Sequence, residues 1–182
     1  MKKTLMWIAL AMVPAWSPVQ ADPAPTDGQS YLALTVPNID VAEYHRPYVA
    51  VWLRNQDSGE IHNISVWYQL GRGGPAGKGG DDKGEQWLKD MRQWWRYSGR
   101  RLDMPVDGIS GATRQPGDYQ LALQSTLSTL APGQYVLNVE AAREVGGREM
   151  LKIPFVLPVS KVAVLTAKGE SELGEVALHL VP

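Results

Sequence analysis

The stretch Tyr48-Val49-Ala50-Val51-Trp52-Leu53 decides the fold that this sequence predicts. Its six residues are all apolar or aromatic, and successive residues of a strand point to opposite faces of a sheet. The run is therefore apolar on both faces, which is typical of a central strand in a sheet that is covered on both sides. Pro47 precedes the run, and the turn-forming residues 55–59 follow it.

Other strand-like runs lie on both sides of this segment. Residues 61–70 follow the polar turn directly, so the two runs predict a hairpin. Short strands separated by turns at intervals of about 8–15 residues are typical of an antiparallel sandwich. We therefore expect an all-β fold, an antiparallel immunoglobulin-like β-sandwich with one inserted α-helix, in which Pro154 and Pro158 mark edge strands. The remaining predicted strands span residues 31–36, 119–124, 135–142, 148–157, 162–167 and 175–181.

The inserted helix is expected at residues 86–97. Its apolar residues recur at the spacing of one helix face, while its basic residues lie largely on the other side. The apolar stripe either covers the sandwich core or offers one Trp to a bound aromatic ring, with an Arg near a phosphate group. The residues concerned are Trp87, Leu88, Met91, Trp94 and Trp95 in the stripe, and Arg92, Arg96, Arg100 and Arg101 as candidate phosphate ligands.

The beginning of the chain predicts export. A basic start at Lys2 and Lys3, an apolar run over 5–13 and the small residue Ala21 form the pattern of a signal peptide, residues 1–21. The apolar run is short for a transmembrane helix, so we expect a periplasmic protein that does not span the membrane. Residues 22–30, which follow the signal peptide, are expected to form a flexible lead. Residues 31–182 are expected to form a single sandwich domain, and residues 71–84 a mobile Gly-rich loop within it.

Composition narrows the possible chemistry. The chain has no Cys, which excludes disulfides, thiolate metal sites, Cys nucleophiles, iron–sulfur clusters and c-type haem attachment. Its three His residues, His45, His62 and His179, share no metal-ligand spacing, so we expect no metal site. The net charge of −1 does not indicate a nucleic-acid partner. Redox chemistry would therefore require an organic cofactor.

The stretch Asp107-Gly108-Ile109-Ser110-Gly111-Ala112-Thr113 predicts an exposed turn. Gly108 and Gly111 permit backbone angles that other residues avoid, and Pro116 disfavours a helix just before it. Thr113 is therefore expected on an accessible loop with Asp107 and Ser110 as polar neighbours. The plain alternative is an ordinary turn that connects two strands.

This stretch resembles the signature Asp-x-x-Ser/Thr-Gly-Ala-Thr, at which a periplasmic flavin transferase attaches FMN. The signature occurs in the FMN-binding domains of the sodium-pumping NADH:quinone reductase and of related extracytoplasmic flavoproteins. The resemblance implies that Thr113 forms a phosphoester with FMN and that Asp107, Ser110, Gly111 and Ala112 complete the cofactor-binding site. In those flavoproteins a Thr or Ser and a helix usually follow, whereas residues 114–117 read Arg-Gln-Pro-Gly here, which implies a different scaffold.

A second resemblance covers residues 31–160. It rests on the following residues: Arg46–Trp52, Trp87–Lys89 with Arg92 and Trp94–Arg96, Ser110–Arg114 with Pro116-Gly117 and Tyr119, Gly133, Tyr135, and Val139–Glu144 with Gly146–Glu149. These residues resemble a family of predicted periplasmic proteins of unknown function. The family implies a sandwich domain and an association with a flavin transferase and a membrane electron-transfer protein, but no established activity.

Two functions follow as hypotheses. The first is a periplasmic electron-transfer protein that carries FMN on Thr113, attached by a separate flavin transferase. The alternative is a cofactor-free β-sandwich that binds a membrane redox partner as an adaptor. We expect a carrier or accessory protein and no catalytic residues, because carboxylates such as Glu140 alternate along strands and are expected on solvated faces. Similarly, Arg143-Glu144 and Arg148-Glu149 are expected to form surface ion pairs.

Overall fold

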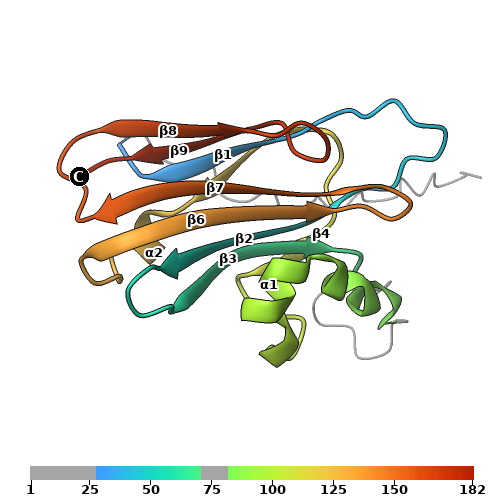
Figure 1. Cartoon of the computed structure of the whole chain (residues 1–182), viewed down its shortest axis with the longest axis horizontal. Helices are drawn as coiled ribbons and strands as arrows, with labels where there is room; N and C mark the ends of the chain where they lie inside the picture. The colour runs from blue at the N-terminus through green and yellow to red at the C-terminus, as the bar shows by residue number, and fades with distance from the viewer. Residues whose placement is uncertain (1–27, 71–81) are drawn as a thin grey trace, which may run out of the picture.

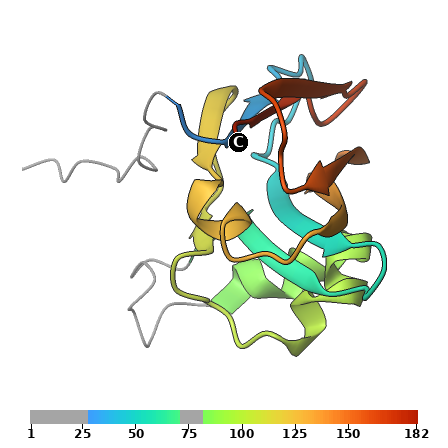
Figure 2. The ribbon, with the colours of Figure 1, turned by 90° about the vertical axis from the view of Figure 1, so that its left-hand side faces the viewer.

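The computed structural model describes residues 28–70 and 82–182, which form two β-sheets packed face to face (Figure 1, Figure 2). The predicted all-β sandwich with a small helical insertion is confirmed.

A four-stranded sheet has the order β5-β1-β9-β8, and a five-stranded sheet has the order β4-β3-β2-β6-β7. The first contains β1 (Tyr31–Val36), β5 (Gly117–Ala122), β8 (Ala163–Lys168) and β9 (Glu175–Leu180). The second contains β2 (Tyr48–Asn55), β3 (Ile61–Tyr68), β4 (Ser110–Ala112), β6 (Gly133–Ala142) and β7 (Arg148–Leu157).

Strand β2 is the central strand of the five-stranded sheet, as its apolar sequence predicts. It pairs antiparallel with β3 and with β6, and the predicted β2–β3 hairpin is confirmed. Its residues Val49, Val51 and Leu53 belong to the core between the sheets, while Ala50 and Trp52 belong to a second cluster on the outer face. β7 is an edge strand and contains Pro154, in agreement with the expectation for that residue.

The main core lies between the two sheets. Buried and half-buried positions alternate along β1, so that Leu32, Leu34 and Val36 point toward the five-stranded sheet. Burying one such aliphatic side chain contributes about 1.5–3 kcal/mol to stability. The opposite layer contributes β2, β6 and β7, and the core therefore links strands that are far apart in the sequence.

Two tyrosines hold the chain where it enters β5 and β6. The sequence Pro-Gly-x-Tyr occurs at the start of both strands, and each Tyr hydroxyl donates to a backbone carbonyl four residues upstream. Tyr119 donates to the carbonyl of Gln115 at 2.7 Å, and Tyr135 donates to that of Ala131 at 2.9 Å. Such tyrosine corners are typical of immunoglobulin-like sandwiches and fix the entry angle of the strand.

The outer face of the five-stranded sheet is covered by a short helical segment (Figure 1). It consists of the 3₁₀ helix η2 (Asp82–Asp90), the α-helix α1 (Arg92–Tyr97) and the 3₁₀ helix η3 (Gly99–Arg101). The expected single helix over 86–97 is therefore wrong, because the helical path changes at Met91. A further short helix, α2 (Gln124–Leu127), follows β5. The outer cluster joins Ala50, Trp52, Val66 and Tyr68 of the sheet to Leu88, Met91 and Trp94 of the cover.

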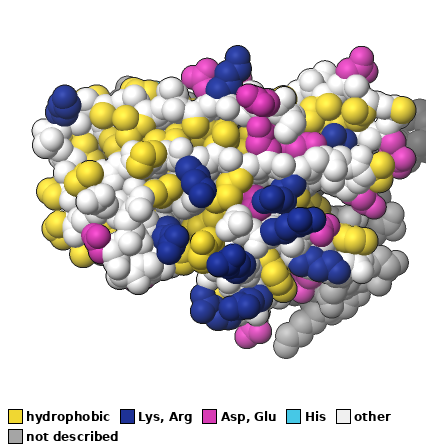
Figure 3. All heavy atoms as spheres, viewed as in Figure 1, with side chains coloured by type: hydrophobic (Ala, Val, Ile, Leu, Met, Phe, Trp, Pro, Cys, Tyr) yellow, Lys and Arg dark blue, Asp and Glu magenta, His cyan; other side chains and the backbone are white. Residues whose placement is uncertain are grey.

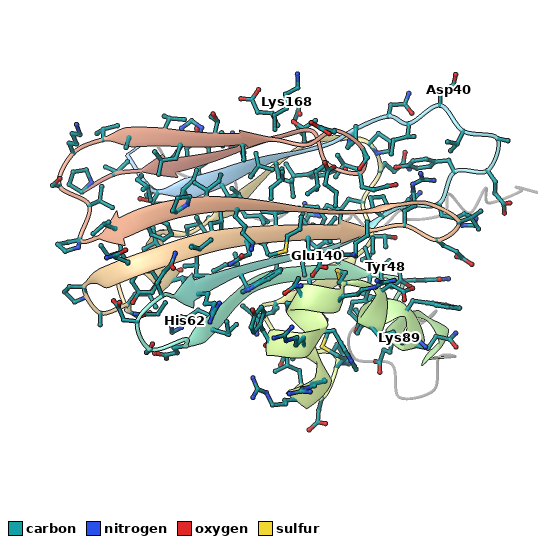
Figure 4. The ribbon with its side chains drawn as sticks, in the orientation of Figure 1. Asp40, Tyr48, His62, Lys89, Glu140 and Lys168 are labelled. Carbon is teal, nitrogen blue, oxygen red and sulfur yellow. The ribbon has the colours of Figure 1, made fainter. Side chains whose placement is uncertain are left out.

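Glu140 explains why α1 begins where it does. This β6 residue is fully buried, and its carboxylate accepts hydrogen bonds from the backbone N–H groups of Gln93 at 3.1 Å and Trp94 at 2.8 Å. It also accepts one from Arg148 Nη1 at 2.8 Å. The expectation of a solvated Glu140 is therefore wrong, because the helix covers this face of β6 (Figure 4). The carboxylate satisfies N–H groups that the start of a helix leaves without partners.

The arginines and glutamates of the β6–β7 hairpin also differ from the expectation of surface ion pairs. Arg143 pairs with Glu172, whose Oε2 lies 2.8 Å from the Arg143 Nε, and the two side chains are only 6% and 3% exposed. Glu149 accepts hydrogen bonds from four consecutive backbone N–H groups of residues 170–173, at 2.6–3.1 Å. These side chains therefore anchor the β8–β9 turn to the β6–β7 hairpin.

Several expectations fall wholly or partly outside the described residues. The predicted signal peptide lies outside them, as does the Gly-rich loop up to residue 81, while residues 82–84 already belong to η2. The flexible lead was expected to include Ser30, but that residue is buried and bonded to Gln124 and Val181. Among the described residues, no helix has the length and hydropathy needed to cross a membrane.

Replacing Glu140 with alanine is expected to lower the free energy of unfolding by about 2–3 kcal/mol, because it leaves two N–H groups without an acceptor and Arg148 without its partner. Urea unfolding followed by Trp fluorescence measures the effect. Glu175→Ala, an exposed change on β9, is the control and should stay within about 0.5 kcal/mol of the original protein. Equal stabilities of the two variants would contradict the structural role of Glu140.

Glu149 should make stability depend on acid pH. Burial by itself would raise the pKa of Glu149, but hydrogen bonds from the backbone N–H groups of 170–173 outweigh it and lower the pKa below its usual 4.5. Its contribution is therefore present above the pKa of the unfolded chain and is lost as the pH falls through the lower pKa of the folded protein. Glu149→Gln should be less stable than the original at neutral pH, and the difference should shrink below about pH 4.5. Urea titrations at several pH values test this, and a difference that does not change with pH would contradict it.

Candidate functional site

Residues 110–112 of the motif form strand β4 rather than the expected turn. β4 runs parallel to β3 at the edge of the five-stranded sheet, with Trp67 opposite Gly111 and Tyr68 opposite Ala112. Two backbone hydrogen bonds flank it, from Val66 N–H to the carbonyl of Ile109 at 2.8 Å and from Thr113 N–H to that of Tyr68 at 3.1 Å. The chain pairs here because it returns to the sheet edge from the helical cover, which the local sequence does not reveal.

A tight turn leads into β4. Asp107 and Gly108 are exposed, and Gly108 has a φ of +73°, a left-handed conformation that glycine adopts at little cost. Ser110 closes the turn, since its Oγ accepts from the N–H of Val106 at 2.8 Å and its own N–H donates to the carbonyl of Val106 at 2.9 Å. The expected exposed turn is therefore confirmed for Asp107 and Gly108 only.

The other predicted site residues differ in their exposure. Ala112 is exposed, whereas Gly111 and Thr113 are half-buried. Gly111 lies against Trp67, and a Cβ added to Gly111 would stand 3.4 Å from Trp67 Cδ1. Thr113 follows the last residue of β4 and is held by its N–H bond to Tyr68, so its position is fixed by the sheet although it lies outside the strand.

A cavity of about 300 Å³ lies beside β4, between the edges of the two sheets. Its walls come from β3 and the turn leading into β4 on one side and from β5 on the other. Among the predicted site residues it includes Ser110 and Gly111, but not Asp107, Ala112 or Thr113. The lining residues are Ile64, Ser65, Trp67, Gly108, Ile109, Ser110, Gly111, Arg114, Leu121 and Ala122.

An arginine stacked on two aromatic rings forms one wall of this cavity. The guanidinium carbon of Arg114 lies 4.1 Å from the centre of the Trp67 ring and 4.9 Å from that of Tyr119. The two rings meet edge to face with centroids 5.4 Å apart. Trp67 is 1% exposed, and its indole N–H has no hydrogen-bond acceptor among the described residues. Stacking of this kind stabilises the arginine cation at the ring face. The indole N–H of Trp67 remains a buried donor without a partner among the described residues.

Sequence reasoning missed Trp67 and Arg114. Trp67 lies in a strand whose apolar residues predict a core position, and Arg114 stands out only as the residue that departs from the flavoprotein signature. The position of Arg114 directly after Thr113 was the available signal. The contact between the two side chains depends on the parallel pairing of β4 with β3, which has no local signature.

The apolar stripe of the helical cover agrees with the first of its two expected roles, because it packs against a face of the sheet. Trp94 is fully buried in the outer cluster and its Nε1 donates to Asn63 Oδ1 at 2.8 Å. Figure 3 shows basic side chains gathered over this part of the molecule. The four exposed arginines Arg92, Arg96, Arg100 and Arg101 do not line the cavity beside β4.

The fold and the site define a β-sandwich in which a short edge strand contains three residues of a seven-residue motif and lies beside a cavity lined in part by Trp67. The family model for predicted periplasmic protein (DUF2271) matches residues 29–175, and the chain belongs to this family. The match confirms the expected family and the expected periplasmic compartment. Searches of curated proteins and of solved structures each found no significant match.

Proposed function

We propose that this protein is a periplasmic electron carrier that holds FMN covalently on Thr113, where a separate flavin transferase attaches it. The observation that carries the proposal is the complete motif from Asp107 to Thr113, placed at a sheet edge directly beside a cavity. FMN, when bound, supplies transfer of one or two electrons, a chemistry for which protein side chains alone are poorly suited.

The surroundings of Thr113 suit a residue that must enter another enzyme's active site. β4 is an edge strand of three residues, so one of its sides has no neighbouring strand in the sheet. Gly111 has no side chain and Ala112 has a small exposed one, so little bulk precedes the hydroxyl. Short edge segments also open at lower free energy than the core of a sheet, which would allow the transferase to reach a half-buried Thr113.

The attachment reaction uses only the hydroxyl of Thr113 from this chain. A bond forms between Thr113 Oγ and the phosphorus of the FMN moiety of FAD, while the pyrophosphate bond of FAD breaks. AMP leaves, and the hydroxyl proton passes to a base of the transferase or to water. The product is a phosphodiester with one negative charge. Arg114, the next residue, supplies a positive charge close to Thr113 in the sequence, which complements that product.

A cofactor-free adaptor is the second candidate, and one observation favours it. The exposed arginines of the helical cover, Arg92, Arg96, Arg100 and Arg101, form no ion pair with a carboxylate within the described part of the chain. An accumulation of unpaired arginines favours an acidic partner surface and speeds association with it. This surface is separate from the motif, so an adaptor would not need Thr113.

Thr113→Ala should abolish flavin attachment, because no hydroxyl remains to receive the phosphorus, whereas Thr113→Ser should retain part of it. Asp107→Ala should reduce attachment while changing stability by no more than about 0.5 kcal/mol, since Asp107 is exposed. The measurement is intact-protein and peptide mass spectrometry after co-expression with a flavin transferase. Thr166→Ala, an exposed threonine on β8, is the matched control and should be modified like the original protein.

The decisive result is the mass of the peptide that contains Thr113. If it stays unmodified in cells whose transferase flavinylates another target, the carrier proposal fails and the adaptor remains. In that case, combined replacement of the four exposed arginines by Gln should weaken capture of an acidic partner, while Thr113→Ala should leave it unchanged.

A further inference from the structure

The cavity beside β4 has the features of a binding site for a flat heteroaromatic ring with carbonyl acceptors. We propose that it receives the ring system of the flavin and that Trp67 and Arg114 are the residues that recognise it. This inference rests on the attachment of FMN to Thr113 proposed above. It goes further by assigning the ring, and not only its phosphate, to a defined place on the protein.

The size and lining of the cavity suit such a ring. Its volume of about 300 Å³ lies at the lower end of the range for ligand pockets, which suits a ring system better than a whole dinucleotide. Ile64 and Leu121 provide apolar walls, while Trp67, Ser65 and Arg114 provide polar groups. A flavin ring has the same division, with an apolar dimethylbenzene end and a pyrimidine end rich in acceptors.

The indole N–H of Trp67 is the first recognition group. It is buried and has no acceptor among the described residues, which is unfavourable unless a ligand or water provides one. Gly111 lines the cavity, and a Cβ built on it would have Trp67 Cδ1 and Nε1 as its nearest neighbours. The N–H edge of the indole therefore lies next to Gly111, and because the nitrogen has almost no accessible surface, a ligand in the cavity reaches it only when the residues around it shift. A carbonyl or ring nitrogen of the flavin would give this donor its missing partner.

Gly111 gains a second role from this arrangement. A Cβ at position 111 would lie 3.4 Å from Trp67 Cδ1 and 4.0 Å from Nε1, so a larger side chain would occupy the space next to the N–H group. The glycine of the motif thus keeps the cavity open at the side where Thr113 follows two residues later. The tethered ring would need only to fold back along β4 to reach Trp67.

Arg114 is the second recognition group. Its guanidinium already stacks on Trp67 at 4.1 Å and lines the cavity, so it holds a positive charge beside the space assigned to the ring. The flavin ring gains negative charge at its pyrimidine end when it accepts electrons. A nearby cation stabilises that form, and Arg114 is therefore expected to raise the reduction potential of the bound flavin.

The experiment compares flavinylated proteins that differ only at the cavity. Arg114→Gln and Trp67→Phe are the test variants; Arg100→Gln and Trp95→Phe are matched controls outside the cavity. Mass spectrometry first establishes the extent of modification at Thr113 in each protein. Flavin emission and the midpoint potential are then measured per bound flavin. Because Trp67 also belongs to the core, unfolding curves show whether Trp67→Phe is folded, and Arg114→Gln carries the test if it is not.

The expected result is full modification at Thr113, a midpoint potential that becomes more negative in Arg114→Gln, and emission that rises in Trp67→Phe because a contacting indole quenches the flavin. Both controls should match the original protein. If Thr113 is modified but the cavity variants behave like the controls, the ring lies elsewhere; the ring site is then refuted and the carrier proposal stands. If Thr113 carries no flavin, the carrier proposal fails and the ring site fails with it.

Discussion

The apolar outer face of the five-stranded sheet is the constraint on which the rest of the structure depends. β2 is buried on both sides, and Trp52 on its outer face has no exposed surface. A sheet strand of this kind requires a second layer on each face. The four-stranded sheet covers the inner face, and the helical segment between β3 and β4 covers the outer one. The helical segment is therefore part of the core architecture rather than an appendage of the sandwich.

The candidate site follows from that cover. Parallel strands cannot be joined by a tight turn and need a long crossover, commonly a helical one. The segment between Tyr68 and Ser110 is such a crossover, and it brings the chain back to the edge of the sheet in the direction of β3. β4 can pair with β3 only because the helical segment first spans the outer face. The motif, the cavity and the Arg114–Trp67 stack therefore owe their positions to the helical segment that covers Trp52.

The sequence predicts the parts of this protein that depend on local patterns. The bounds of β1 and β7 are as expected, and β2 is central, because each follows from apolar residues, turn residues and prolines close by in the chain. The break at Met91 was not predictable in this way, because the carboxylate that caps α1 comes from Glu140, more than forty residues later. The parallel pairing of β4 and the contact of Arg114 with Trp67 are equally long-range. The motif residues could be found from the sequence, but the cavity that they adjoin could not.

The proposed attachment of FMN would place two opposing demands on the motif, and β4 has properties that suit both. A residue that another enzyme modifies must be easily released from the fold, whereas a residue that later positions a ring beside Trp67 must be held in place. A strand of three residues at a sheet edge is bound by few hydrogen bonds and opens at low free energy. The bond from Thr113 N–H to Tyr68 and the Ser110 turn restore its position once it closes. If FMN is attached as proposed, contacts of the ring in the cavity would add to the stability of the closed state only after modification, so that the same strand would be loose before attachment and held afterwards.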